Sequence, residues 1–177
     1  EVELFIDTAF TQFKWRNIGL LALLAYEWGQ RPIDITLLEW TDIDFDKQMV
    51  TIKQTKRGET VKLPVENKIL KLILQQGIDW DWQPYILPHL RPADGNYIPI
   101  PSGMVSQLAN EVKSACGLNM NLHMGDLRKT AIVELIESGV DSLAIMHVTG
   151  HKNVQSLNPY NKRNFDTAKS ALDMRRG

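Results

Sequence analysis

Three short motifs follow one another in the C-terminal third of the chain: Gly125-Asp-Leu-Arg128-Lys-Thr, then Leu143-Ala-Ile-Met-His-Val-Thr-Gly-His151, then Tyr160. Arg128 precedes His151 by 23 positions, and His151 precedes Tyr160 by nine. An arginine can donate paired hydrogen bonds to a phosphate, and a tyrosine can act as a nucleophile. This order of residue types therefore points to chemistry on a phosphate group.

Helical patterning dominates the rest of the chain. Apolar residues recur at helical spacing in several segments, with Gly, Pro or Ser at many of the segment ends. The predicted helices cover 8–28, a short segment from Pro32 with Ile33, Leu37 and Leu38 on its inner face, 66–76, 103–115, 126–138, 142–148, 152–157 and 165–174. Residues 45–65 predict short antiparallel strands around a turn at 56–59, and 77–101, with five of the eight prolines, predicts a loop. The expected fold is mainly α with a small antiparallel sheet.

The composition is that of an ordinary globular protein. The chain has 177 residues, 44% hydrophobic and 23% charged, which fits one domain with a full core. The longest apolar run, 18–26, is too short to cross a bilayer, and no secretory signal is visible, so we expect no membrane association and a cytoplasmic location. The single cysteine, Cys116, excludes an internal disulfide framework.

Charge is unevenly distributed, although the net charge is only −1. Residues 47–62 contain five cations against one acid, and 151–163 contain three cations and no acid. A basic face that contacts nucleic acid is compatible with this pattern, and so is scattered solvated charge.

A second set of motifs lies in the first half of the chain. Trp28-Gly-Gln-Arg31-Pro-Ile-Asp34 is followed by Leu37-Leu-Glu-Trp40-Thr-Asp-Ile-Asp44, and Gln54-Thr-Lys56 precedes the predicted turn. With the C-terminal motifs, this ordered set resembles the tyrosine recombinases of the phage integrase type over nearly the whole chain. The resemblance implies one catalytic domain over 1–177, mainly helical with a three-stranded antiparallel sheet, and without the family's N-terminal DNA-binding domain.

The resemblance also implies roles in breaking and rejoining a DNA strand. Metal-free cleavage needs a nucleophile, stabilisation of the phosphorane charge and a proton for the leaving oxygen. Tyr160 would attack phosphorus and form a 3′-phosphotyrosyl ester, while Arg31 and Arg128 would bind the non-bridging oxygens. Lys56 would protonate the leaving 5′ oxygen, and His151 would donate to the phosphate or assist the proton transfer. No cofactor, metal ion or ATP is expected.

Other residues would support this chemistry. Asp34, in the first turn after Arg31, would orient a neighbouring basic group. Double-stranded DNA is the expected partner, with contacts from Lys53, Arg57, Lys129, Lys152, Lys162 and Arg163. Because family members act as tetramers on paired sites, the segment 165–174 is expected either to dock on a neighbouring subunit or to pack on its own domain.

One position departs from the family pattern. Three residues before its second arginine the family has His, Lys or Arg, where this chain has Gly125. His123 could take over that function, or the function could be missing. The sequence leaves open a non-catalytic DNA-binding relative, which Gly125 favours, a type IB topoisomerase-like enzyme and a helical protein-interaction module. A metal site at His147 and His151 has no support from paired cysteines or a carboxylate motif.

Overall fold

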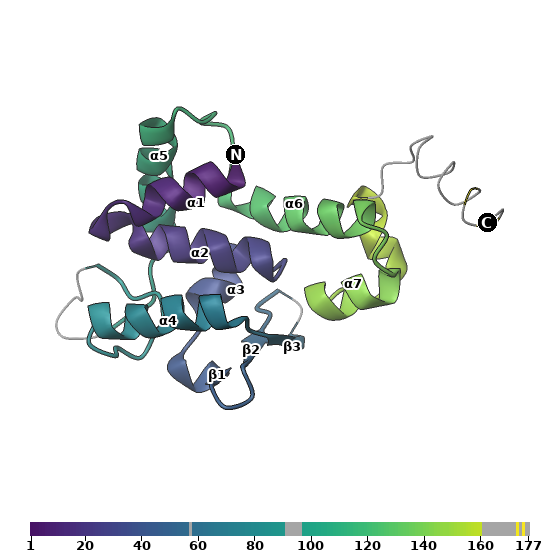
Figure 1. Cartoon of the computed structure of the whole chain (residues 1–177), viewed down its shortest axis with the longest axis horizontal. Helices are drawn as coiled ribbons and strands as arrows, with labels where there is room; N and C mark the ends of the chain where they lie inside the picture. Colours follow the sequence, from purple (N-terminus) through teal and green to yellow (C-terminus); the bar gives the residue numbers. More distant parts are fainter. Residues whose placement is uncertain (57, 91–96, 161–172, 174, 176–177) are drawn as a thin grey trace.

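The computed structural model describes residues 1–56, 58–90, 97–160, 173 and 175 (Figure 1). Its α-helices are α1 (Val2–Phe10), α2 (Arg16–Glu27), α3 (Pro32–Thr36), α4 (Asn67–Asp79), α5 (Ser102–Cys116), α6 (Met124–Glu137) and α7 (Ser142–Thr149). Short 3₁₀ helices are η1 (Phe13–Trp15), η2 (Trp40–Asp42) and η3 (Val154–Tyr160). Strands β1 (Ile43–Asp44), β2 (Met49–Lys53) and β3 (Thr60–Pro64) form an antiparallel sheet in that order. The predicted fold, mainly helical with a three-stranded antiparallel sheet, is confirmed.

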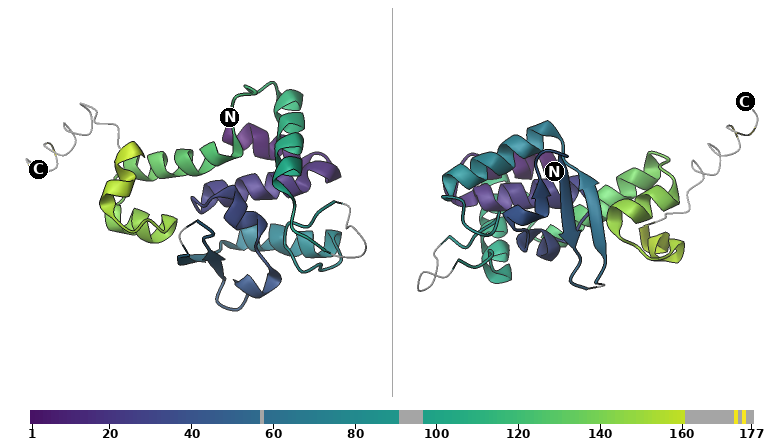
Figure 2. Two further views of the ribbon diagram at one scale, coloured as in Figure 1. Left: turned by 180° about the vertical axis from the view of Figure 1, so that it is seen from behind. Right: turned by 90° about the horizontal axis from the view of Figure 1, so that it is seen from below.

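Helix α2 lies in the core, and α1, α3, α5 and α6 all contact it (Figure 2). Its fully buried side chains include Ile18, Leu20, Leu21 and Leu24. The single helix predicted over 8–28 is wrong: α1 and α2 are separate because Gln12 adopts an extended backbone between them (φ −128°, ψ 134°). Gly19 allows the two helices to pack closely, since a Cβ there would lie 3.0 Å from the Cβ of Ala9.

The sheet ends in a hairpin turn at one edge of the helical body. β2 pairs with β3 from Met49↔Pro64 to Lys53↔Thr60, and alternate residues face the core. Beyond the last pair, the backbone nitrogen of Gln54 donates to the Glu59 carbonyl (2.7 Å). β2 contacts α3 and β3 contacts α7, so the hairpin is held by two helices that are far apart in the sequence.

Helix α3 and the two residues after it bury only part of the predicted face: Leu38 is buried, as predicted. Ile35 and Leu38 are buried, but Ile33 and Leu37 are 48% and 39% exposed, so their predicted inward orientation is wrong. Ile35 lies within this five-residue helix, whereas Leu37 and Leu38 follow its end at Thr36, so helical spacing no longer sets their orientation.

The proline-rich segment is attached to the body by hydrogen bonds more than by regular structure. Its first residues extend α4 to Asp79. After that, Asn17 Nδ2 donates to the Pro88 carbonyl (2.8 Å), and Trp40 Nε1 donates to the Gln83 carbonyl (2.5 Å). Its described part therefore packs on the body.

Helix α6 is fixed at its start and along its length. The buried Lys113 of α5 donates from Nζ to the carbonyls of Met120 (2.9 Å) and Leu122 (2.7 Å), just before α6 begins. From α2, Tyr26 Oη donates to the Glu134 carboxylate of α6 (2.5 Å), and this hydrogen bond, with burial, raises the pKa of Tyr26 to about 12. These contacts hold the helix that carries Arg128 against the body.

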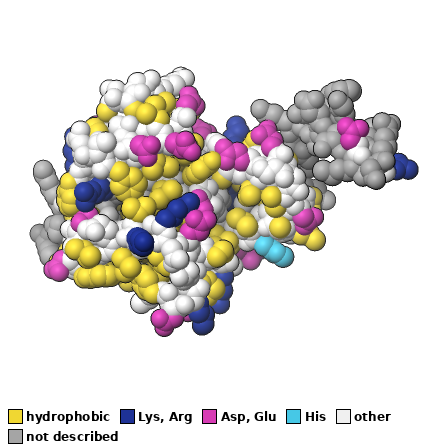
Figure 3. Space-filling model, in the orientation of Figure 1, with side chains coloured by type: hydrophobic (Ala, Val, Ile, Leu, Met, Phe, Trp, Pro, Cys, Tyr) yellow, Lys and Arg dark blue, Asp and Glu magenta, His cyan; other side chains and the backbone are white. Residues whose placement is uncertain are grey.

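The described helices are all too short or too polar to cross a lipid bilayer. On the face shown in Figure 3, acidic and basic side chains are mixed with hydrophobic ones, and Lys or Arg side chains gather at the lower edge, near the sheet.

Candidate active site

Arg31 stands at the junction of α2 and α3. Gly29 adopts a left-handed backbone (φ +57°) that ends α2, and Pro32 starts the next helix, so Arg31 takes the position immediately before α3. Its side chain is one-fifth exposed, and its Nη1 lies 3.5 Å from Asp34 Oδ2. The local sequence thus fixes a partly exposed guanidinium at the end of the central helix.

Asp34 connects this guanidinium to the hairpin turn. Its side chain is fully buried, and Oδ1 accepts hydrogen bonds from the backbone nitrogen and the hydroxyl of Thr55, both at 2.8 Å. Thr55 directly precedes Lys56, whose side chain is exposed. Asp34 therefore contacts the arginine at one oxygen and holds the backbone next to the lysine at the other.

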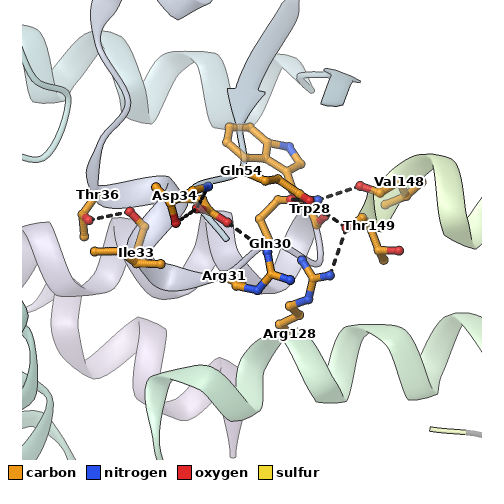
Figure 4. Close-up of polar contacts among 11 residues, drawn as sticks. Trp28, Gln30, Arg31, Ile33, Asp34, Thr36, Gln54, Arg128, Val148 and Thr149 are labelled. Carbon is orange, nitrogen blue, oxygen red and sulfur yellow. Dashed lines mark hydrogen bonds and ion pairs between the residues drawn. The ribbon is translucent and has the colours of Figure 1, made fainter. Parts of the chain in front are cut away.

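Arg128 reaches the same region from α6. It is buried, and its Nη2 donates to the carbonyl of Thr149 at the end of α7 (2.9 Å). In Figure 4 the guanidinium groups of Arg31, at the α2–α3 junction, and Arg128, on α6, point into a common space. Two forked cations are suited to hold the non-bridging oxygens of one phosphate.

Two buried glutamines join the hairpin to α7. Gln54 Nε2 donates to Gln30 Oε1 and to the Thr149 carbonyl, both at 2.8 Å. Gln30 Nε2 in turn donates to the Val148 carbonyl (2.6 Å) (Figure 4). The Thr149 carbonyl thus accepts from both Arg128 and Gln54, and one buried polar network connects the hairpin, the α2–α3 junction, α6 and α7.

His151 and Tyr160 follow this network in the chain. His151 is buried, and its Nδ1 lies 2.6 Å from Thr149 Oγ1. Tyr160, the last residue of η3, is half-buried against a small apolar cluster that includes Leu157, and its ring lies edge-on to the His151 ring at 6.1 Å between centroids. The predicted nucleophile and the predicted histidine are therefore neighbours.

Three of the six cations predicted to contact DNA are among the described residues. Lys53, Lys129 and Lys152 are exposed. Lys53 pairs with Asp42 (3.4 Å) and Lys152 with Glu59 (2.8 Å). Such exposed pairs are worth at most about 1 kcal/mol, so a phosphate can compete with them. Arg57, Lys162, Arg163 and most of the segment 165–174 lie outside the described residues.

His123 and Gly125 lie at the start of α6. His123 is exposed just before the helix, where its backbone nitrogen donates to Asp126 Oδ2 (2.8 Å), and it lines a cavity of about 620 Å³ between α1, α3, α5 and α6. Gly125 is also exposed, and a Cβ there would meet no atom within 4 Å. Arg128 lies farther along the helix. Within the described residues, no three His, Cys, Asp or Glu side chains group as a metal site would require.

A model of the phage integrase family matches residues 1–167. The chain belongs to the phage integrase family. The resemblance to tyrosine recombinases seen in the motifs is thereby confirmed, and the arginines, the histidine and the tyrosine of the motifs lie in or beside one network.

Individual relatives of this phage integrase family member agree with the assignment. Tyrosine recombinase XerC from Pediococcus pentosaceus is 27% identical over 152 residues, which is 83% of this chain and 50% of XerC. The crystal structure of XerA recombinase has a TM-score of 0.75 at 15% identity and covers 99% of this chain and 61% of its own. XerH recombinase bound to difH substrate has a TM-score of 0.76 at 13% identity and covers 100% and 53%. The structures share the fold, and the chain spans about half the length of XerC.

The sequence motifs did not predict the two buried side-chain amides of the network. Gln30 and Gln54 belong to the sequence motifs, but the motifs indicate no role for them. Gln54 continues the inward alternation of Val50 and Ile52, and this pattern was the signal that its amide would be buried. A buried amide needs hydrogen-bond partners, which the strand pattern alone does not identify.

Proposed function

We propose that this protein is a site-specific DNA recombinase that cleaves and rejoins DNA through a 3′-phosphotyrosyl intermediate. The observation that carries the proposal is the buried network, in which Arg128 and Gln54 share the Thr149 carbonyl, with Arg31 at one side and His151 at the other. These residues lie together although they come from the α2–α3 junction, α6 and the end of α7. Packing alone does not require two arginines to converge on one space.

In the proposed reaction, Arg31 and Arg128 bind the non-bridging oxygens of the scissile phosphate and stabilise the charge of the phosphorane. The Tyr160 hydroxyl gives its proton to His151 or to water, its oxygen forms a bond to phosphorus, and the bond from phosphorus to the 5′ oxygen breaks. Lys56 gives a proton to that leaving oxygen, which becomes a free hydroxyl. His151 assists at the phosphate or in the proton transfer. Rejoining reverses these steps and conserves the energy of the ester, so the scheme requires no ATP.

The same proposal covers partners and setting. XerH is described as bound to its difH substrate, and a lambda integrase as a dimer on a core site. By this likeness we propose double-stranded DNA and further copies of this protein as partners, with 1–177 as the catalytic domain and with action in the cytoplasm. Exposed Lys53, Lys129 and Lys152 would contact the DNA backbone, which predicts strong salt dependence of binding.

Covalent trapping tests the proposal. The full protein is incubated with a duplex of its recombination site that carries a nick near the scissile phosphate, so that the short cleaved fragment diffuses away. The expected result on a denaturing gel is a protein–DNA adduct that is absent for Tyr160→Phe. Tight, salt-dependent DNA binding without any adduct would support a non-catalytic DNA-binding relative instead.

Gly125 provides a second prediction. Because the position is exposed and open, Gly125→His should fold normally and place an imidazole near the start of α6, where the family has a basic residue. We expect single-turnover cleavage to become about tenfold faster or more, since a positioned proton donor or acceptor contributes at least that much. Gly125→Ala is the matched control. Equal rates for the His and Ala variants would show that this position does not limit the reaction.

A further inference from the structure

Thr149 contacts two of the motif residues through different atoms. Its backbone carbonyl accepts from Arg128 Nη2 and Gln54 Nε2. Its side-chain hydroxyl lies 2.6 Å from the Ile145 carbonyl and 2.6 Å from His151 Nδ1. The residue is completely buried, so water does not compete for these contacts. The contact of the hydroxyl with His151 can therefore be changed without removing the carbonyl that holds Arg128.

Counting hydrogens fixes the direction of the contact with His151. A hydroxyl has one hydrogen, and a carbonyl oxygen has none. At 2.6 Å, the contact between the Thr149 hydroxyl and the Ile145 carbonyl requires the hydroxyl to donate. The hydroxyl must then accept from His151, so Nδ1 of the imidazole carries a hydrogen.

We propose that Thr149 is a positioning residue that holds His151 in the tautomer protonated at Nδ1, so that Nε2 is the nitrogen that serves the reaction. A neutral His151 then keeps its lone pair on Nε2 and can accept a proton there, and a charged His151 donates from the same nitrogen. The role of Nε2 in cleavage rests on the proposed function, whereas the tautomer follows from the contacts of Thr149 alone.

The tautomer is measured directly by nitrogen NMR of the imidazole rings. The protein has four histidines, and His151 is assigned by comparison with a His151→Gln variant. At a pH where imidazole is neutral, wild type is expected to show a protonated Nδ1 and an unprotonated Nε2. Thr149→Val, which keeps the β-branched shape and the backbone carbonyl, is expected to lose this preference, and Thr149→Ser is expected to retain it.

The trapping assay supplies the second measurement. Thr149→Val should slow single-turnover cleavage by about tenfold to a hundredfold, the usual effect of removing a partner that orients a functional histidine. Thr149→Ser should remain near the wild-type rate, and salt-dependent DNA binding should be equal in all three proteins. Substitutions of His151 test the same point. A glutamine side chain places its amide donor near the position of the imidazole Nε2, and an asparagine side chain places it near the position of Nδ1. We therefore expect His151→Gln to cleave faster than His151→Asn.

Two results would overturn the assignment: an Nε2-protonated tautomer in the wild type, or a Thr149→Val variant that keeps both the tautomer and the wild-type rate. If Thr149→Val fails to fold, the wild-type tautomer and the order of the two His151 variants still decide. If the wild type forms no adduct, the proposed recombinase function fails, while the tautomer in the wild type separately supports or overturns the role of Thr149.

Discussion

Replacing Arg128 with lysine is expected to slow DNA strand cleavage by about a thousandfold, because one oxyanion-binding donor is typically worth two to three powers of ten and lysine cannot form the same fork. Arg128 is buried and already donates through Nη2 to the Thr149 carbonyl. The lysine ammonium can keep the charge near this carbonyl, but it cannot bind the carbonyl and present a planar pair of donors to a phosphate. Single-turnover cleavage of nicked DNA measures the effect.

Lys129 is the matched control for Arg128. It is the next residue of α6 and is exposed, so Lys129→Gln removes a cation without touching the buried network. We expect this variant to bind DNA more weakly, with a smaller salt dependence, and to cleave bound DNA at nearly the wild-type rate. If Arg128→Lys also cleaved bound DNA at the wild-type rate, Arg128 would stabilise the fold and would not stabilise the transition state.

Gly150→Ala is expected to lower the free energy of unfolding by about 3 kcal/mol. Gly150 has φ +70°, a conformation that costs an ordinary residue about 1–2 kcal/mol. A Cβ at this position would also lie 2.5 Å from the Gln54 side-chain amide. Gln54 would have to move away from Gln30 and from the Thr149 carbonyl, and each lost buried hydrogen bond costs about 1 kcal/mol or more. Urea unfolding monitored by circular dichroism measures the loss.

A substitution at Gly139 separates the backbone cost of the positive φ from the cost of the contact with Gln54. It has a similar backbone angle, φ +75°, but a Cβ there would meet no atom within 4 Å. Gly139→Ala should therefore cost only the backbone conformational energy, about 1–2 kcal/mol. Equal losses for the two variants would contradict a tight contact between Gly150 and Gln54. A larger loss at Gly150, together with slower cleavage, is the expected pattern.

Much of the fold and the motif order could be predicted because each depends on local sequence. The strands followed from alternation, as in Val50 and Ile52, and the helix ends from Gly29 and Gly150. The family resemblance followed from spacing, because Arg128, His151 and Tyr160 keep fixed distances along the chain. These features need no knowledge of which segments meet in space.

The buried polar network could not be predicted from the sequence, because it depends on contacts between distant segments. Neither Gln30 nor Gln54 indicates that its partners are the carbonyls at the end of α7, about a hundred residues away. The break between α1 and α2 lies at the extended backbone of Gln12 and lets the two helices pack on each other at Gly19, and the exposure of Ile33 depends on how α3 docks on β2. In each case contacts between distant segments outweigh the local pattern.

The most direct test of the account is to identify the amino acid that carries the DNA. The covalent adduct is digested with a nuclease and with trypsin, and tandem mass spectrometry locates the remaining nucleotide. The proposed reaction predicts a nucleotide phosphate on the tryptic peptide 153–162, attached to Tyr160 through its phenolic oxygen. A nucleotide on Ser156 or on a peptide from elsewhere in the chain would contradict Tyr160 as the nucleophile.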